Sequence, residues 1–354
     1  MMNSQENQYD QEMKTIFADE IDNDTLVIDG NQQIQNFQFV EQLEINKLVI
    51  NECFRLKFNR VPQNITELLL YNCKLKNLDG IQEMRQLESF NLKQNSLVSD
   101  SKEVIDISAL STLTSLTELY LSGNNLCDVS SLRSLLSLKT LDLQKNQISS
   151  ASSLFKLTNL TRLNLGGNKL TNISALRFLF NLQYLQLWGN QISDIYPLKS
   201  LSQISKLNLN SNQIVDVSCL SFMSQLNELH IFKNQIVSIR SLKNLMQLNY
   251  VELDYNFITD LSPILDNPAV YDFVTDNQAT PNENQIRISN QINVIQETEL
   301  TVMKNKQMNY KMKLMKQKLK TVVKKNMKLI MKNHSLFSEK ILALVQTEQQ
   351  EVDQ

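Results

Sequence analysis

The sequence has little glycine, proline or histidine. Six glycines and five prolines in 354 residues are far below the combined share of about 12% that is usual in proteins. This composition excludes collagen-like, glycine/serine-linker and proline-rich disordered chains, and it argues against glycine-rich phosphate loops. Only two histidines occur, His230 and His334, so a histidine-based zinc cluster or a Ser/His/Asp hydrolase would have to be built around one of them. We therefore expect no metal site and no cofactor.

Cysteine is also scarce, and long apolar runs are missing. Cys53, Cys73, Cys127 and Cys219 show no CxxC spacing and are too few for a disulfide framework in a chain of this length, which favours a reducing compartment. The first ten residues are polar and lack the apolar stretch of a secretory signal. Nowhere do about 18 uncharged apolar residues follow one another, as a membrane span requires. The sequence predicts a cytoplasmic protein, and a nuclear location is also compatible with it.

A repeat dominates the first three quarters of the chain. From Leu116 the pattern LxxLxLxxNxL, followed by three further apolar positions, restarts at a constant interval, at Leu138, Leu160, Leu182, Ile204, Leu226 and Leu248. Weaker units begin near Asn23 and at Ile45, Ile65 and Leu87, the last with an insertion around residues 98–104 that we interpret as neutral. A fixed period of 22 residues, as between Leu116 and Leu138, indicates stacked structural repeats. We count about eleven coils over residues 21–276.

The spacing within one coil predicts its local structure. In Leu141, Asp142 and Leu143 apolar and polar residues alternate, which is typical of a short strand with one buried face. Ile173, Leu176 and Leu179 recur every three residues, which suits a 3₁₀ or short α-helical return leg. One such coil cannot bury its own apolar side, whereas stacked coils share a continuous core. The sequence therefore predicts a curved solenoid with a parallel β-sheet on one side.

The asparagine at the ninth position of each coil has a structural task. Where the chain leaves the strand, backbone groups lose their sheet partners, and an inward asparagine can donate to and accept from neighbouring coils. In the second and third units this position holds Cys53 and Cys73, which tolerate burial and retain a weak donor, so we expect no redox role for them. The predicted ladder consists of Asn95, Asn124, Asn146, Asn168, Asn190, Asn212, Asn234 and Asn256, with Asn31 offered by the first unit.

The unit LxxLxLxxNxIxDIxxLxxL resembles the 22-residue leucine-rich repeat of bacterial internalins and of the nuclear regulatory subunit of protein phosphatase 1. The resemblance covers most of the chain, from the first weak unit to the last coil before the tail. It implies an α/β repeat solenoid, a right-handed leucine-rich repeat arc with a concave parallel sheet and 3₁₀ or short α return legs. It also implies a binding scaffold that grips partners on the concave sheet, without choosing the partner.

The concave face is expected to present the third, fifth and seventh residue of each unit. In the first two thirds these are mostly polar and indicate a solvated surface, for example Lys93, Ser122, Asp142 and Gln144. In the later units aromatic residues alternate with charged and amide groups, a composition typical of interaction hot spots. The predicted partner-binding set is Tyr184, Gln186, Trp188, Lys206, His230, Phe232, Tyr250 and Tyr255.

Two roles for these aromatic residues remain open. In the hypothesis that we favour, a protein docks over residues 182–253 with Trp188 and Phe232 as anchors. In the alternative, the rings stack laterally on neighbouring strands and stabilise the sheet. Adjacent strands also place His230 beside Glu252 as a candidate acid/base pair, but two exposed groups without a nucleophile or metal make a poor catalytic site, so we expect no enzyme.

The two ends differ from the repeats. Residues 1–20 predict an N-terminal helical cap, because Met13, Ile16 and Phe17 share one helical face. Residues 277–354 predict a basic helical tail with 13 basic and 7 acidic residues. Its apolar spacing suits a short coiled coil. The tail could cap the last coil, pair with another helix or bind an acidic membrane surface, whereas nucleic acid is not expected because stacking aromatics other than Tyr310 are absent.

The sequence as a whole predicts a non-catalytic scaffold or adaptor that binds another protein on its concave face. One alternative is a regulatory subunit of a protein phosphatase or similar enzyme, which the resemblance allows without any residue specifying it. An alternative of another class is a membrane or cytoskeletal tether that acts through the lysine-rich tail.

Overall fold

The fold is taken from a computed structural model, which describes residues 21–275 apart from 30–36, 38–39, 41–42, 54–55, 59–60, 74, 76, 94 and 96–105. The predicted cap over residues 1–20, Asn31, the insertion at 98–104 and the tail at 277–354 lie outside the described residues.

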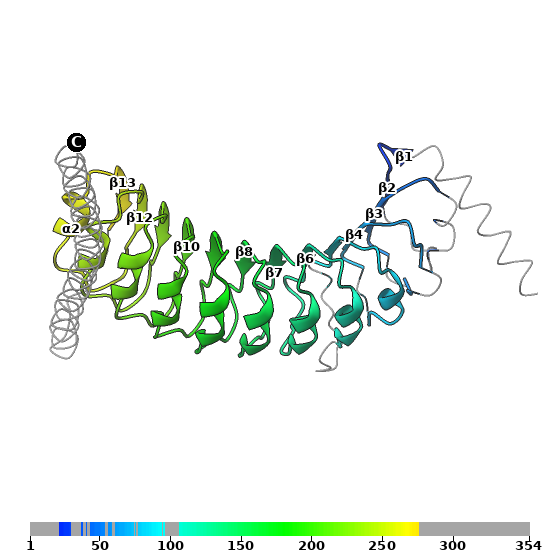
Figure 1. The fold of residues 1–354 in the computed structure, drawn as a ribbon, viewed down its shortest axis with the longest axis horizontal. Coiled ribbons are helices and arrows are strands. Elements are labelled where there is room, and N and C mark those ends of the chain that lie inside the picture. The colour runs from blue at the N-terminus through cyan, green and yellow to red at the C-terminus, as the bar shows by residue number, and fades with distance from the viewer. Residues whose placement is uncertain are drawn as a thin grey trace, which may run out of the picture. The chain divides into compact units, whose positions relative to one another are not determined.

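The described coils form an arc with the strands on its inner side and the return legs on its outer side (Figure 1). One sheet holds all thirteen described strands in chain order. Twelve of them, from β2 onward, pair in parallel, and β1 pairs antiparallel with β2. The strands are β1 Ile21–Asp22, β2 Thr25–Asp29, β3 Lys47–Asn51, β4 Glu67–Tyr71, β5 Ser89–Asn91, β6 Glu118–Tyr120, β7 Thr140–Asp142, β8 Arg162–Asn164, β9 Tyr184–Gln186, β10 Lys206–Asn208, β11 Glu228–His230, β12 Tyr250–Glu252 and β13 Asp272–Val274.

Each return leg from η2 onward contains one short helical turn. Eight of the described turns are 3₁₀ helices and one is α-helical, as the three-residue spacing of the apolar positions predicts. Pro197 and Pro263 stand in the first two positions of η7 and α2, where a missing N–H group costs nothing. The turns are η2 Ile81–Glu83, η3 Ser108–Thr112, η4 Ser130–Ser134, η5 Ser152–Lys156, η6 Ser174–Phe178, η7 Tyr196–Ser200, η8 Ser218–Phe222, η9 Arg240–Leu242 and α2 Ser262–Leu265.

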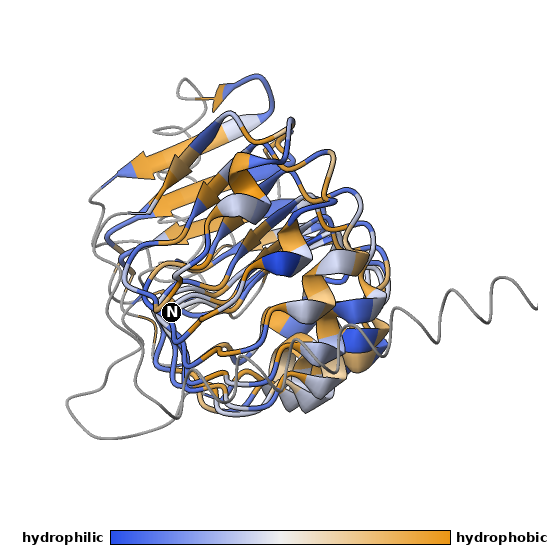
Figure 2. Ribbon diagram, turned by 90° about the vertical axis from the view of Figure 1, so that its left-hand side faces the viewer, coloured by the Kyte–Doolittle hydropathy of each residue, from blue (hydrophilic) through white to orange (hydrophobic). Residues whose placement is uncertain are grey.

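The core lies between the sheet and the return legs. Figure 2 looks along the stack and shows hydrophobic residues recurring in the strands on one side and in the turns on the other. In one coil, Leu160, Leu163 and Leu165 from the strand and Leu176 and Leu179 from the return leg are fully buried. Because the regular coils supply the same inward positions, the strands from β6 onward pair at a constant shift of one repeat, so that Leu141 on β7 lies beside Leu163 on β8. This register places each concave side chain beside its counterpart in the next coil.

The ends of the sheet differ from the sequence prediction. The prediction gave about eleven coils, whereas a twelfth parallel strand, β13, pairs with β12. Its residues Asp272, Phe273 and Val274 lack the leucine spacing, which is why the pattern missed the strand. At the other end, Asn23 and Asp24 both adopt positive φ, at 47° and 61°. Two such residues make the tight turn that suits an antiparallel hairpin, here β1 and β2.

Candidate partner-binding surface

The inward asparagines bind backbone groups where the chain leaves each strand. Asn146 donates through Nδ2 to the carbonyl oxygens of Leu121 at 3.0 Å and Leu143 at 2.9 Å. Its Oδ1 accepts from the backbone N–H groups of Asn124 at 3.0 Å and Leu126 at 2.9 Å. All eight ladder asparagines from Asn95 to Asn256 are buried. One side chain thus satisfies backbone groups of two successive coils, which fixes the direction in which the adjoining concave residues point.

The two early cysteines occupy the same position. Cys73 directs its Sγ at the carbonyl oxygens of Ile50 at 3.5 Å and Tyr71 at 3.3 Å, which correspond to carbonyls that the asparagines bind in later coils. Its backbone N–H donates to Asn95 Oδ1 at 2.8 Å. Burial raises the pKa of the Cys53 thiol to about 12 and also raises the pKa of Cys73. Both thiols therefore stay protonated and unreactive at neutral pH.

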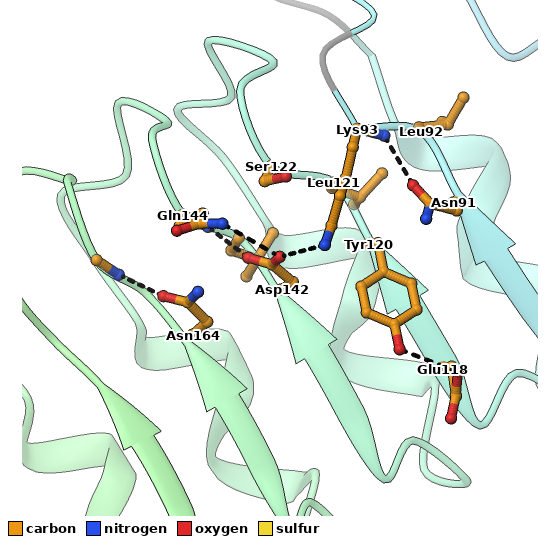
Figure 3. Close-up of polar contacts among 12 residues, drawn as sticks. Asn91, Leu92, Lys93, Glu118, Tyr120, Leu121, Ser122, Asp142, Gln144 and Asn164 are labelled. Atoms are coloured by element: carbon orange, nitrogen blue, oxygen red, sulfur yellow. Dashed lines mark hydrogen bonds and ion pairs between the residues drawn. The ribbon is translucent and has the colours of Figure 1, made fainter. Parts of the chain in front are cut away.

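In the middle of the concave face, the side chains contact one another. Lys93 Nζ reaches across the β6 coil to Asp142 Oδ2 at 3.1 Å and lies 4.7 Å from the centre of the Tyr120 ring (Figure 3). Tyr120 Oη donates to Glu118 Oε2 at 3.0 Å. The prediction of a solvated surface is wrong for Asp142 and Ser122, which are buried. Tyr120 was not predicted as part of this surface, although its fifth position in the unit could have identified it.

The Trp188 side chain packs against the preceding coil. A Cβ atom on Gly166 would overlap Nε1, Cε2 and Cδ1 of the indole, and a Cβ on Gly167 would lie 3.1 Å from its Cη2. The ring therefore spans these two glycines and is half-buried. Gly167 also has a positive φ of 65°, but Gly166 does not, so its lack of a side chain serves the indole rather than the turn. Lateral packing of Trp188 is thus part of the structure, and the ring remains partly accessible from the concave side.

Substitution Gly166→Ala should displace the indole, because the added methyl group and the ring cannot occupy the same space. Trp188 is the only tryptophan of the chain, so its fluorescence reports on this contact alone. We expect the emission maximum of the folded variant to move to longer wavelength as the ring enters water. An unchanged spectrum would contradict the seating of Trp188 on the glycine pair.

A charged network runs across β10, β11 and β12. Lys206 Nζ lies 2.6 Å from Glu228 Oε2, and Glu228 Oε1 lies 2.8 Å from His230 Nε2. The other ring nitrogen, Nδ1, lies 2.8 Å from Glu252 Oε2, which also accepts from Asn210 Nδ2 at 3.1 Å. The predicted proximity of His230 to Glu252 is confirmed, whereas Glu228 and Asn210 were not predicted as members of this site.

The network accounts for both ring nitrogens of His230. Both of its nitrogens face carboxylates that belong to this chain, those of Glu228 and Glu252. Among the described residues, no group of three or more His, Cys, Asp or Glu side chains could hold a metal ion. The side chains of Lys206, Glu228, His230 and Glu252 therefore form a fixed polar surface.

The pKa of Glu228 lies below its usual value, because its carboxylate accepts a hydrogen bond from His230 and is paired with Lys206. A lowered pKa in the folded state adds stability above the unfolded-state pKa, and this contribution is lost as the pH falls through the folded-state pKa. Wild type should therefore be more stable than Glu228→Gln at pH 7, and the difference should shrink as the pH is lowered through the folded-state pKa of Glu228. Urea unfolding of both proteins across this range checks the prediction, which a pH-independent difference would contradict.

The remaining predicted aromatic residues each contact a residue of an adjacent coil. Phe232 and Tyr255 meet edge to face with centroids 5.2 Å apart, and the Tyr250 ring lies 5.2 Å from His230. Tyr184 instead contacts the preceding coil, with the Arg162 guanidinium 4.5 Å from its ring centre. The predicted set therefore comprises two neighbouring groups. One, formed by Tyr184, Gln186 and Trp188, lies on the β9 coil, and the other lies on the β11 and β12 coils with Lys206 beside it.

These side chains are accessible to different degrees. Tyr184, Gln186, Trp188 and Phe232 are half-buried, and Tyr255 is 52% exposed. Tyr255 has a positive φ of 55°, at the position where Gly167 and Gly189 stand in other coils. The concave surface of residues 182–255 therefore offers rings that are held by neighbours yet remain open to a partner.

Comparisons with known proteins agree with this architecture. The family description "Leucine Rich repeats (2 copies)" matches residues 136–177 and 181–221, and "Leucine Rich Repeat" matches residues 115–135. A comparison with curated protein sequences found no significant match. Among the described residues, no helix is long and apolar enough to cross a membrane.

Three solved structures illustrate the likeness. Internalin C2 of Listeria monocytogenes is 39% identical over 53% of this chain and 80% of its own, with a TM-score of 0.50. A second internalin of that species, inlF, is 26% identical over 76% of this chain and 89% of its own, with a TM-score of 0.54. A plant peptide hormone receptor, RGFR1, solved in complex with RGF2, is 18% identical over 69% of this chain and 41% of its own, with a TM-score of 0.55, and shows the fold alone. The chain belongs to the leucine-rich repeat family, and its solenoid resembles internalin-type structures.

Proposed function

We propose that this chain is a non-catalytic scaffold that binds another protein on the concave face of residues 182–255. The observation that carries the proposal is the set of partly accessible rings on one face of the β9, β11 and β12 coils, Trp188, Phe232, Tyr250 and Tyr255. Aromatic residues surrounded by charged and amide groups are typical of the centres of protein interfaces. The plant receptor with the same fold was solved in complex with its ligand RGF2, which supports ligand binding by solenoids of this kind.

The charged network gives the surface its specificity. Lys206, Glu228, His230 and Glu252 are held by one another at 2.6 to 2.8 Å, so their positions are fixed before a partner arrives. A preorganised surface loses less conformational entropy on binding than a mobile one. A partner that matches it must place apolar side chains beside Trp188 and Phe232 and polar groups over the network between them.

The phosphatase-subunit and tether hypotheses have less support. A role as a phosphatase regulatory subunit is supported by the repeat resemblance alone. The tether would act through residues 277–354, which lie outside the described residues. We place the scaffold inside the cell, a proposal supported by the four free cysteines, of which Cys53, Cys73 and Cys219 are buried.

The experiment is affinity capture from the cell of origin with immobilised wild type and with the double variant Trp188→Ala/Phe232→Ala. The matched control is Leu136→Ala/Met246→Ala, which removes two exposed apolar side chains from the return legs. We expect the control to recover the wild-type partners and the concave variant to lose them, with all three proteins equally folded by circular dichroism. Recovery of the same partners by the concave variant would contradict the proposal.

A further inference from the structure

A second aromatic surface lies on the return legs, on the side of the coils away from the strands (Figure 1). Its rings are Phe155, Phe178 and Tyr196, which are 42%, 40% and 51% exposed, and the half-buried Phe222. They come from four successive turns, η5 to η8. Together with the cations Lys156, Arg177 and Lys199 they form what we term the outer stripe.

Each ring of the outer stripe is paired with a cation. Lys156 Nζ lies 5.8 Å from the centre of the Phe155 ring, and the Arg177 guanidinium lies 5.0 Å from that of Phe178. Lys199 Nζ lies between two coils, 4.8 Å from the Tyr196 ring centre and 4.4 Å from that of Phe222. The Phe155 and Phe178 rings meet edge to face with centroids 6.1 Å apart. The contacts therefore join the rings of η5 and η6 in one pair and those of η7 and η8 in another.

The stripe carries positive charge with few acids nearby. From η5, η6 and η7 to the strand that follows each, residues 154–161, 176–183 and 198–205 contain no aspartate or glutamate. Among the described residues, neither Lys156 nor Arg177 has an ion pair with a carboxylate. The nearby Asp194 and Asp216 stand at the start of their legs, where they accept backbone N–H groups at 2.8 and 2.7 Å.

Folding does not account for these side chains. The core position of each turn is filled by a separate leucine, and Leu154, Leu176, Leu198 and Leu220 are all fully buried. Exposed cation–π pairs contribute only about 0.5–1 kcal/mol each. Three large rings left open to water beside cations have the composition of a surface that meets an acidic, partly apolar partner.

We propose that the outer stripe binds an extended acidic polypeptide whose carboxylates and apolar side chains share one face. Successive side chains of an extended chain point to opposite faces, so such a chain carries its acidic and apolar residues in pairs. Its apolar side chains lie against the rings of the stripe, and its carboxylates lie beside the cations that are 4.4–5.8 Å from those ring centres. A flat lipid surface fits less well, because the stripe lies on the convex side of the arc and a plane touches only part of it (Figure 1).

The test uses a fluorescein-labelled octapeptide in which Glu pairs alternate with Leu pairs, so that both residue types share each face of the extended chain, with fluorescence anisotropy as the readout. Wild type should bind it at about 50 mM salt and more weakly at about 200 mM, because screening weakens exposed charge pairs. Phe155→Ala/Phe178→Ala should weaken binding at least about tenfold, the effect of losing an interface anchor. Lys156→Glu/Arg177→Glu should abolish it, since the carboxylates would then meet like charge.

The controls separate this surface from the concave one. Trp188→Ala/Phe232→Ala and Leu136→Ala/Met246→Ala should bind the octapeptide as wild type does, whatever their effect on the concave partner. An octapeptide in which Lys pairs alternate with Leu pairs should not bind wild type. The proposal is overturned if wild type fails to bind the Glu/Leu peptide, if the stripe variants bind it equally well, or if phosphatidylserine-containing vesicles bind the stripe at least as strongly as the peptide does.

Discussion

Replacing Asn190 by alanine should lower the free energy of unfolding by about 1–3 kcal/mol, the cost of a buried backbone group left without a partner. Asn190 Nδ2 donates to the carbonyl oxygens of Leu165 at 3.0 Å and Leu187 at 2.9 Å. Its Oδ1 accepts from the Leu170 N–H at 2.9 Å. Alanine supplies none of these bonds. The Leu165 and Leu187 carbonyls keep a donor, since they also accept from Asn168 Nδ2 at 2.9 Å and Asn212 Nδ2 at 3.0 Å, whereas the Leu170 N–H loses its side-chain partner. Urea unfolding followed by circular dichroism measures the loss.

Two further variants sharpen this prediction. Gln191→Ala changes an exposed neighbour and should alter stability by less than about 0.5 kcal/mol. Asn190→Cys should fall between wild type and Asn190→Ala, because Cys73 directs its thiol at the corresponding carbonyl oxygens. If Asn190→Ala unfolds at the same urea concentration as Gln191→Ala, the ladder does not hold the coils together.

Trp188→Ala and Phe232→Ala should each weaken binding of the concave partner about 30-fold, the effect of removing a hot spot worth about 2 kcal/mol. Their effects should add to about 1,000-fold in the double variant, because separated residues without shared partners act independently. Trp188 packs on Gly166 and Gly167, whereas Phe232 packs on Tyr255. Titration calorimetry with the partner recovered by affinity capture gives the three affinities.

The same variants distinguish docking from lateral packing. If the rings only stabilise the sheet, their loss lowers the free energy of unfolding and leaves the affinity of the folded protein unchanged. If they anchor a partner, affinity falls even where stability is kept. Undiminished affinity in the double variant would therefore assign Trp188 and Phe232 to sheet stability alone.

Much of the fold could be predicted because each coil repeats one spacing. The alternation of apolar and polar residues around Leu141 predicts a strand, and the asparagine at the ninth position predicts where the chain leaves it. Neither inference needs distant residues. Stacking at a shift of one repeat then determines which residues are neighbours across the sheet. The contact between His230 and Glu252 was predicted in this way, since both stand at the fifth position of adjacent coils.

The missed contacts depend on side-chain direction, which the repeat does not specify. Lys93 passes over one coil to reach Asp142, so its partner is not its register neighbour. The Trp188 indole turns toward Gly166 because that position lacks a side chain. This fit involves two coils, so the sequence of one unit does not reveal it. The concave residue Glu228 lies between Lys206 and His230 and could have been identified from its third position.

The outer stripe was missed for a different reason. Phe155 and Phe178 occupy return-leg positions that vary from coil to coil, so they carry no periodic signal. From the sequence alone, exposed aromatics were given a role only on the concave face. The pairing of these rings with Lys156 and Arg177 emerges only once successive legs are stacked.

The most direct test of the central claim is site-specific photo-cross-linking with benzoylphenylalanine in place of Gln186, in the cell of origin. Gln186 lies on β9 between Tyr184 and Trp188, inside the proposed interface. We predict a discrete cross-linked species from this position, absent when Phe232→Ala is added and absent when the probe replaces the exposed Glu83 on η2. If Gln186 gives no cross-link, or one that Phe232→Ala leaves unchanged, the concave surface of residues 182–255 is not where the partner binds.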